Sequence, residues 1–261
     1  MKYYLLNSPF FGRRSLLVLF AAGCFFSPGL HAQLTGPTPF PDPKNPSAWP
    51  GAGPIAVLPW MTDNRTYFWS QRTEKQGAVV LIGDSLFGNW IYAKVKAEDA
   101  FPHLKKVANR GIGGDVSRGV LFRFQEDVLD LHPEAVAILI GSNDLSAKGD
   151  VSDIISNISQ VVDMAQKADP KMPIILCKLP PRQSPSAPID PNEVLKLDSA
   201  IEDYAKGKSY ITVFDLYSLF ATPDGKPDPV NYKEDLLHPS DAGYVKMAQG
   251  LGKVFDDLKL Q

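Results

Sequence analysis

Histidine and cysteine are scarce in this chain, which has four histidines and two cysteines among 261 residues. No Cys/His cluster has the spacing of metal ligands, so we expect neither a metal nor another cofactor. A dominant charge is missing too, because 27 Lys and Arg residues face 29 Asp and Glu residues. Without a long basic run the chain lacks a surface that neutralises phosphates, and we expect no nucleic-acid partner.

The chain also lacks an apolar run long enough to cross a bilayer, which takes about 20 residues. The stretch SLLVLFAAGCFF follows basic residues and precedes a Pro-Gly pair and LHA at 30–32, a pattern typical of a signal peptide over residues 1–32. We therefore expect an exported protein, periplasmic or secreted, with no stable membrane span after leader removal. The alternative is a lipid anchor at Cys24, because AAGC loosely resembles a lipobox. Cleavage after Ala32 would leave Cys177 alone and exclude an internal disulfide.

Proline is concentrated just after this leader. Eight of the 23 prolines lie between residues 33 and 59, where they disfavour helix and central strand. We expect an extended arm, loose or wrapped over the domain, and then a short lead-in helix within residues 62–77. The arm and this helix make up residues 33–74, and a single domain follows over residues 75–261.

From residue 78 onward, short runs rich in valine and isoleucine alternate with longer amphipathic stretches. This alternation is typical of repeated βα units around a parallel sheet covered on both faces. Helical spacing of apolar residues marks 151–168 and 192–207, and a last helix begins at Ser240. The sequence predicts a three-layer α/β fold with a five-stranded parallel sheet, whose strands lie within 78–83, 105–111, 135–141, 173–179 and 210–216.

Several residues with chemical potential follow these strands at their carboxyl ends, the edge where open α/β sheets bind ligands. Parallel strands end at the same edge, so we expect these residues to lie close together. They are Ser85 after the first strand, Gly113 and Gly114 after the second, Asn143 after the third, and Asp235 and His238 after the fifth.

Ser85 fits two roles when GDSL at 83–86 is taken alone, because a serine at this place can cap a helix or act as a nucleophile. The histidines favour the second role. His103 and His132 precede strands and belong to the opposite edge, so only His238 can reach Ser85. Asp235 stands three residues earlier in DLLHP, close enough to hold the imidazole.

A serine hydroxyl needs an adjacent base to take its proton as it attacks a carbonyl. His238 can serve as that base, and Asp235 can fix the imidazole tautomer and stabilise the imidazolium. Three donors could stabilise the oxyanion: the backbone N–H groups of Ser85 and Gly114, and the side-chain amide of Asn143. Taken alone, GIGGD and GSND would instead be read as a tight turn and a capping turn.

Two other motif interpretations do not fit. GIGGDVSRG lacks the spacing of a dinucleotide-binding loop, since Val116 stands where the third glycine is needed. The nucleophile elbow G-x-S-x-G is absent as well, since Phe87 follows Ser85 by two positions.

Four short motifs in this order carry a family resemblance: GDSL (83–86), GIGGD (111–115), GSND (141–144) and DLLHP (235–239). Together they resemble the four blocks of the SGNH (GDSL-type) hydrolase superfamily. The resemblance implies a flavodoxin-like α/β/α fold, the triad of Ser85, Asp235 and His238, and the oxyanion donors named above. NRGIGGDVSRGVLFRF and LPPR look most like bacterial relatives of the catalytic subunits of platelet-activating factor acetylhydrolase.

We therefore expect a serine esterase that removes short acyl groups, acetyl above all, from carbohydrates. Three side chains near the active edge are candidate substrate contacts, namely Trp90, Arg118 and Arg182, although core packing for Trp90 and solvated surface for the arginines are the simpler roles. Two alternatives stay open. One is an acyltransferase that uses the same triad, and the other is a non-catalytic glycan-binding protein on the same scaffold.

Overall fold

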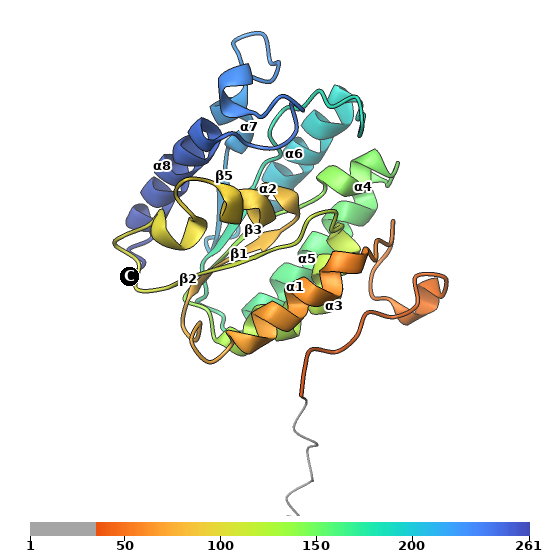
Figure 1. The fold of residues 1–261 in the computed structure, drawn as a ribbon, viewed down its shortest axis with the longest axis vertical. Coiled ribbons are helices and arrows are strands. Elements are labelled where there is room, and N and C mark those ends of the chain that lie inside the picture. The colour runs from red at the N-terminus through yellow and green to blue at the C-terminus, as the bar shows by residue number, and fades with distance from the viewer. Residues whose placement is uncertain (1–34) are drawn as a thin grey trace, which may run out of the picture. The chain divides into compact units, whose positions relative to one another are not determined.

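The computed structural model describes residues 35–261, so the predicted signal peptide and Cys24 lie outside the described residues. Gly36–Gln261 forms one compact unit that includes the proline-rich arm. Its sheet has five parallel strands in the order β2-β1-β3-β4-β5 (Figure 1), which confirms the predicted fold class. The strands are β1 (Val79–Gly83), β2 (Val107–Gly111), β3 (Ala135–Leu139), β4 (Ile174–Cys177) and β5 (Ile211–Phe214).

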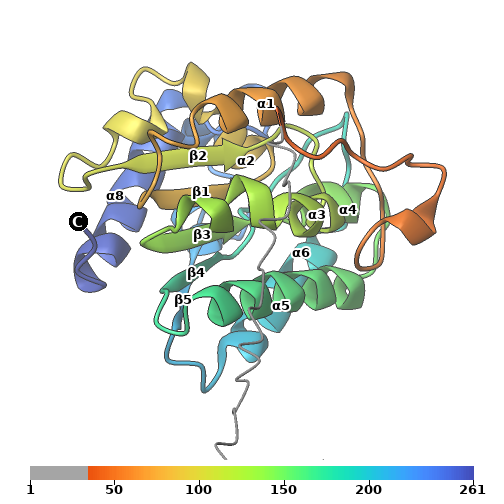
Figure 2. The same cartoon turned by 90° about the horizontal axis from the view of Figure 1, so that it is seen from below.

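Helices cover both faces of the sheet. In Figure 2, α3 (Ser117–Asp127) and α5 (Val151–Ala168) lie in front of the sheet, and α8 (Asp241–Asp257) lies behind it. α6 (Pro191–Ala205) packs against α5, and α1 (Pro59–Ser70) packs against α3. The shorter elements are α2 (Ser85–Gly88), α4 (Ser142–Ser146), α7 (Leu216–Phe220) and the 3₁₀ turns η1 (Pro46–Ala48), η2 (Asn89–Tyr92), η3 (Ala97–Asp99), η4 (Leu129–Leu131) and η5 (Pro229–Asn231).

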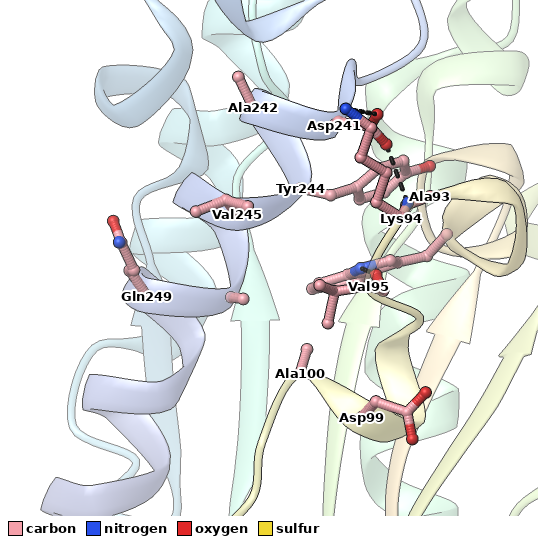
Figure 3. A pocket seen from close by; sticks show the side chains of 12 residues that line it. Ala93, Lys94, Val95, Asp99, Ala100, Asp241, Ala242, Tyr244, Val245 and Gln249 are labelled. Carbon is pink, nitrogen blue, oxygen red and sulfur yellow. Dashed lines mark hydrogen bonds and ion pairs between the residues drawn. The ribbon is translucent and has the colours of Figure 1, made fainter.

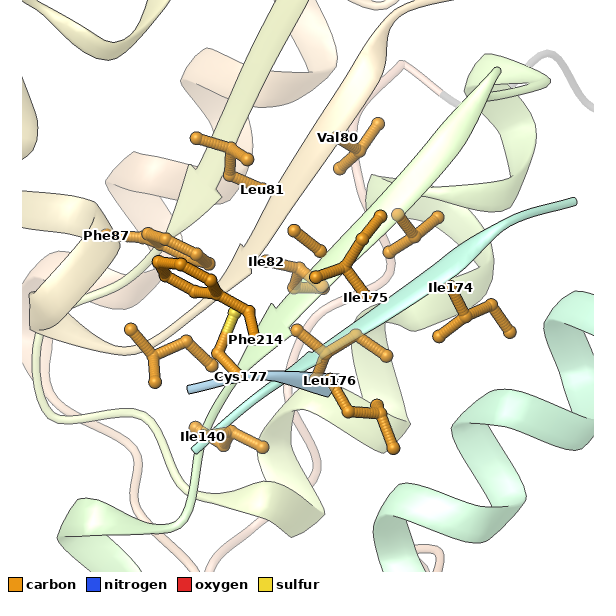
Figure 4. Packing of buried hydrophobic residues seen from close by; sticks show 14 of the residues in the cluster. Val80, Leu81, Ile82, Phe87, Ile140, Ile174, Ile175, Leu176, Cys177 and Phe214 are labelled. Carbon is orange, nitrogen blue, oxygen red and sulfur yellow. The ribbon is translucent and has the colours of Figure 1, made fainter. Parts of the chain in front are cut away.

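The core lies between the sheet and these helices. All residues of β1, β2, β3 and β4 are buried, as expected for parallel strands covered on both faces. On α5 the residues Ile154, Ile158 and Val162 recur at helical spacing and are buried against the rest of the core. Figure 4 shows part of this packing, in which Ile82 and Phe87 belong to the same cluster as Ile175, Cys177 and Phe214.

The arm is tied to the domain by polar side chains. The Arg118 guanidinium donates to the carbonyl oxygens of Pro46, Pro50 and Gly53 at 2.7, 2.8 and 3.2 Å. Asn157 on α5 exchanges two hydrogen bonds with the backbone of Ala52. Since proline-rich backbone cannot pair in a sheet, these side-chain bonds supply the partners that its carbonyl groups need.

α1 is fixed by an apolar and an ionic contact. Met61 and Phe68 pack with Ile112 in a small cluster separate from the main core. Arg65 lies between the carboxylates of Glu126 and Asp127, at 2.6 and 3.3 Å. α1 therefore holds a defined position beside the turn after β2. Within residues 35–261 no helix combines the length and the apolar character needed to cross a bilayer.

Candidate active site

Ser85 stands at the first position of α2, directly beyond the carboxyl end of β1. The cap of this helix is Asp84, whose carboxylate accepts from the backbone N–H of Leu86 at 2.9 Å. The Ser85 hydroxyl is therefore not used as the cap. α2 is also pressed against β2, since a Cβ on Gly111 would lie 2.3 Å from the Gly88 nitrogen. Only glycine allows so close an approach of two backbones.

Asp235 and His238 lie beyond β5 and α7, in the loop between η5 and α8. Asp235 Oδ1 accepts from the backbone N–H groups of Leu237 and His238, both at 2.9 Å, so the carboxylate organises its own loop. Leu236, which follows Asp235 directly, has a φ of +46°, a left-handed conformation that turns the chain sharply. A hydrogen bond from the Lys233 N–H to the His238 carbonyl closes the loop at 2.8 Å.

The loop places the imidazole between the carboxylate and the serine. His238 Nδ1 lies 2.6 Å from Asp235 Oδ2, and His238 Nε2 lies 3.0 Å from Ser85 Oγ. Partial burial alone would raise the pKa of Asp235, but the hydrogen bonds from His238 and Leu237 outweigh it and hold the pKa below its ordinary value. Asp235 is therefore ionised at neutral pH and attracts a proton to Nδ1.

The turn after β2 lies beside Ser85 and His238, with the backbone of Gly113 and Gly114 facing the same cleft. Gly114 has a φ of +83°, a left-handed conformation that favours glycine, and a Cβ there would lie 2.3 Å from Leu58 Cδ1, so the end of the Leu58 side chain would have to move. A Cβ on Gly113 would lie 3.9 Å from Ser85 Cβ, which places this turn next to the serine. Among residues 35–261 no group accepts from the backbone N–H of Gly114.

Asn143 comes from the first turn of α4, beyond the end of β3. Its Nδ2 donates to the Asp115 carbonyl at 2.9 Å and lies 3.5 Å from Asp84 Oδ2. The first hydrogen bond fixes the plane of the amide. The second is at the limit of hydrogen-bond length, so one N–H of the amide is only weakly engaged.

Two buried carboxyl groups, Asp84 and Asp144, are direct chain neighbours of Ser85 and Asn143. Burial raises the pKa of Asp84 to about 7, although the Leu86 N–H and the charge of Arg182 oppose the shift. Burial likewise raises the pKa of Asp144 to about 6, against the hydrogen bonds from Ser117. Asp144 joins the start of α3 to α4, because its carboxylate accepts from both the N–H and the hydroxyl of Ser117.

A cleft of about 450 Å³ opens over Ser85 and His238. Its walls include side chains that the sequence did not single out. Trp60 and Tyr92 are 49% and 75% exposed, and they come from α1 and from the 3₁₀ turn η2. Exposed aromatic side chains at a cleft are suited to contact a substrate. The additional lining residues are Trp60, Asn64, Gly88, Asn89, Ile91, Tyr92 and Leu237.

Trp90, a candidate substrate contact in the sequence, does not line this cleft and has the core-packing role given above as the simpler one. Its side chain is 1% exposed and stacks on Tyr244 of α8 with a ring-centroid distance of 5.0 Å. The indole N–H donates to the Val95 carbonyl at 3.1 Å. Trp90 is thus a core residue that borders a different hollow of about 550 Å³ beside α8, where Figure 3 shows Lys94 joined to Asp241.

The two predicted arginine contacts are also engaged elsewhere. Arg118 holds the arm, as described above, and its side chain is buried. Arg182 donates to the hydroxyl of Ser146 at 2.7 Å and also to Ser142 and the Ala187 carbonyl, so it ties the loop after β4 to α4. Neither side chain lines the cleft, and neither is a solvated surface residue.

Residues 35–261 contain no cluster of three or more His, Cys, Asp and Glu side chains that could bind a metal ion. Ser85 and His238 line the cleft, and with the Asp235 carboxylate behind the imidazole they form one hydrogen-bonded row. On a parallel α/β/α sheet, this arrangement is typical of the class of ester hydrolases that act through a serine.

Comparison with known proteins gives the family. The model of the GDSL-like lipase/acylhydrolase family matches residues 73–246, so the chain belongs to this family and is a carboxylic ester hydrolase, and the resemblance stated above is confirmed. Human platelet-activating factor acetylhydrolase IB subunit alpha2 is 22% identical over 200 residues, which cover 76% of this chain and 84% of that protein.

Solved structures share the fold. A GDSL-like lipase of Bacteroides thetaiotaomicron is 25% identical with a TM-score of 0.64, over 73% of this chain and 98% of that one. An acetylxylan esterase of Geobacillus stearothermophilus is 20% identical with a TM-score of 0.53, over 72% of this chain and 97% of that one. The family match begins at residue 73, so the arm and α1 lie outside it.

Proposed function

We propose that the protein is a serine esterase that removes short acyl groups, acetyl above all, from carbohydrates. The observation that carries the proposal is the row of three side chains in which His238 Nε2 lies 3.0 Å from Ser85 Oγ and His238 Nδ1 lies 2.6 Å from Asp235 Oδ2. These distances are those of hydrogen bonds along which a proton can pass.

In the proposed mechanism, Ser85 Oγ attacks the ester carbonyl carbon while its proton moves to His238 Nε2. The imidazolium, stabilised by Asp235, then returns this proton to the leaving alcohol, and the acyl group stays on the serine as an ester. Water attacks this acyl-enzyme with His238 again as the base, which releases the acid and restores the serine.

The carbonyl oxygen becomes an oxyanion during each attack and needs donors that are already in place. The backbone N–H of Gly114 has no other acceptor within residues 35–261. The N–H of Ser85, at the first position of α2, has no partner inside its helix. The weakly engaged N–H of Asn143 is the third proposed donor.

A carbohydrate substrate is supported by the exposed aromatic side chains of the cleft, Trp60 and Tyr92, because sugar rings pack on aromatic faces. The acetylxylan esterase with the same fold is a second support. We further propose that residues 1–32 direct export to the periplasm or the medium, which N-terminal sequencing of the protein from each cell fraction would test.

The test is acetate release from a panel of acetylated xylan, acetylated pectin, acetylated sialic acid and short-chain lipid esters. The proposal predicts release from at least one glycan and none by Ser85→Ala. Product analysis with an added acceptor sugar separates hydrolysis from acyl transfer, since transfer would acetylate the sugar. Turnover of lipid esters alone would exclude the carbohydrate part of the proposal.

A further inference from the structure

The Trp60 side chain makes a hydrogen bond directly beside the proposed oxyanion donor Gly114. Its indole N–H donates to the Gly113 carbonyl at 2.8 Å. The Gly113 carbonyl and the Gly114 N–H belong to one peptide group, and in a planar trans peptide they point in opposite directions. A group that fixes the carbonyl therefore fixes the direction of the N–H that we propose as an oxyanion donor.

This peptide group needs such an anchor. It is flanked by glycine on both sides, and glycine allows a peptide plane to rotate at little cost. The left-handed φ of Gly114 is held on one side by Leu58 and Met61, which lie against its Cα. Trp60 holds the other end of the same peptide, through the carbonyl.

The anchor lies close to the reacting groups. A Cβ on Gly113 would be 3.7 Å from Trp60 Nε1 and 3.9 Å from Ser85 Cβ, so only the bare glycine separates the indole from the serine. α1 is itself held by Arg65 and by the cluster around Met61. The indole N–H thus comes from a fixed helix.

We propose that Trp60 is a positioning residue for catalysis: its N–H orients and polarises the Gly113–Gly114 peptide so that the Gly114 N–H donates to the oxyanion. A peptide whose carbonyl accepts a hydrogen bond is a stronger donor at its N–H. The inference rests on the proposed serine mechanism. It gives α1, which precedes the family-matched residues, a direct part in that mechanism.

The variant that tests this is Trp60→Phe, which keeps an aromatic ring and removes the N–H. The matched control is Tyr67→Phe, an exposed aromatic residue on the same helix. For each protein we would measure kcat and KM with p-nitrophenyl acetate, the thermal midpoint, and the Ki of trifluoroacetone. This ketone adds to the serine and places an oxyanion in the site.

We expect kcat of Trp60→Phe to fall roughly five- to tenfold, the factor that corresponds to one lost neutral hydrogen bond. KM and the thermal midpoint should match those of Tyr67→Phe, and Ki should rise by the same factor as kcat falls. An unchanged kcat would overturn the inference, and so would a higher KM for p-nitrophenyl acetate at constant kcat, because Trp60 would then act only as a substrate contact. A lower kcat with an unchanged Ki would overturn it too.

The same assays distinguish a failure of this inference from a failure of the proposed serine mechanism. Turnover that survives in Ser85→Ala would refute the serine mechanism and the inference together. Turnover that needs Ser85 and does not change in Trp60→Phe would refute the role of Trp60 alone.

Discussion

His238 Nε2 lies 3.0 Å from Ser85 Oγ although 153 positions separate the two residues in the chain. The contact exists because β1 and β5 are parallel strands of one sheet, so the loops that follow them leave from the same edge. The imidazole is directed at the serine by Asp235, which accepts from the backbone of the loop and from the ring at once.

Asn143→Ala removes the only side-chain amide among the proposed oxyanion donors. We expect kcat for p-nitrophenyl acetate to fall by roughly 10²–10³, the usual effect of deleting one such donor. Steady-state kinetics would measure it, and the thermal midpoint would show that the fold is kept. A loss of only a few-fold would mean that Asn143 serves the turn at Asp115 and not the oxyanion.

Asp235→Asn keeps the shape of the side chain and, with its one oxygen on the loop backbone, places an NH2 donor where Oδ2 accepts from the imidazole N–H. The ring would then favour the tautomer that cannot take the serine proton, and we expect kcat to fall by about 10⁴. Glu234→Gln, at the exposed neighbouring position, is the matched control and should retain full activity. Comparable activity of the two variants would contradict the role given to Asp235.

Arg118→Ala leaves the carbonyl groups of Pro46, Pro50 and Gly53 without their donor. We expect the free energy of unfolding to decrease by about 2–4 kcal/mol, since three hydrogen bonds from the buried, charged guanidinium to part-buried carbonyl groups would be lost. The arm should also become sensitive to limited proteolysis, whereas Lys44→Ala at an exposed arm position should change neither property. Normal stability together with a raised KM for an acetylated sugar would instead restore Arg118 as a substrate contact.

Asp198→Asn tests a buried carboxyl group that does not line the cleft. One oxygen accepts from the Leu179 N–H at 2.7 Å and the other has no partner within the described residues. Burial raises the pKa of Asp198 from 3.8 to about 7, despite the Leu179 N–H and the charge of Lys178. The folded state therefore keeps its proton over a pH range in which the unfolded chain has lost it.

Because the folded state binds this proton more tightly than the unfolded chain does, the direction in which stability changes with pH is fixed. The contribution of Asp198 to stability should be lost as pH rises from about 4 to about 7, at up to about 1.4 kcal/mol per pH unit. Asp198→Asn should lack this contribution, while the buried carboxyl groups of Asp84 and Asp144 titrate in both proteins. The stability of the variant relative to the wild type should thus increase with pH across this window. Denaturant unfolding at several pH values would measure it, with the exposed Asp63→Asn as control, and a flat or opposite trend would contradict the raised pKa.

Much of the fold could be predicted because the signals are local and repeated. All five strands lie inside the predicted ranges, and α5 spans Val151–Ala168, the range in which apolar residues such as Ile154, Ile158 and Val162 recur at helical spacing. The shared edge of Ser85, Asn143 and His238 follows from the topology of a parallel sheet. The catalytic roles of these residues are still predictions.

The side chains that line the cleft could not be predicted from the sequence, because they are brought there by tertiary contacts. The sequence does not show that Trp60 in an N-terminal helix reaches the turn after β2. The sequence places Trp90 near the active edge, but it does not show which face of a short 3₁₀ turn packs against α8. Arg118 and Arg182 bind backbone carbonyls and serine hydroxyls, partners that leave no charge pattern in the sequence.

The central claim is that His238 activates Ser85 as a nucleophile. The most direct measurement is covalent labelling with a fluorophosphonate, followed by peptide mapping by mass spectrometry. We predict one adduct on Ser85 in the wild type, and strongly reduced labelling at that residue in His238→Ala under the same conditions. Labelling at another residue, or equal labelling of Ser85 without the imidazole, would contradict the claim.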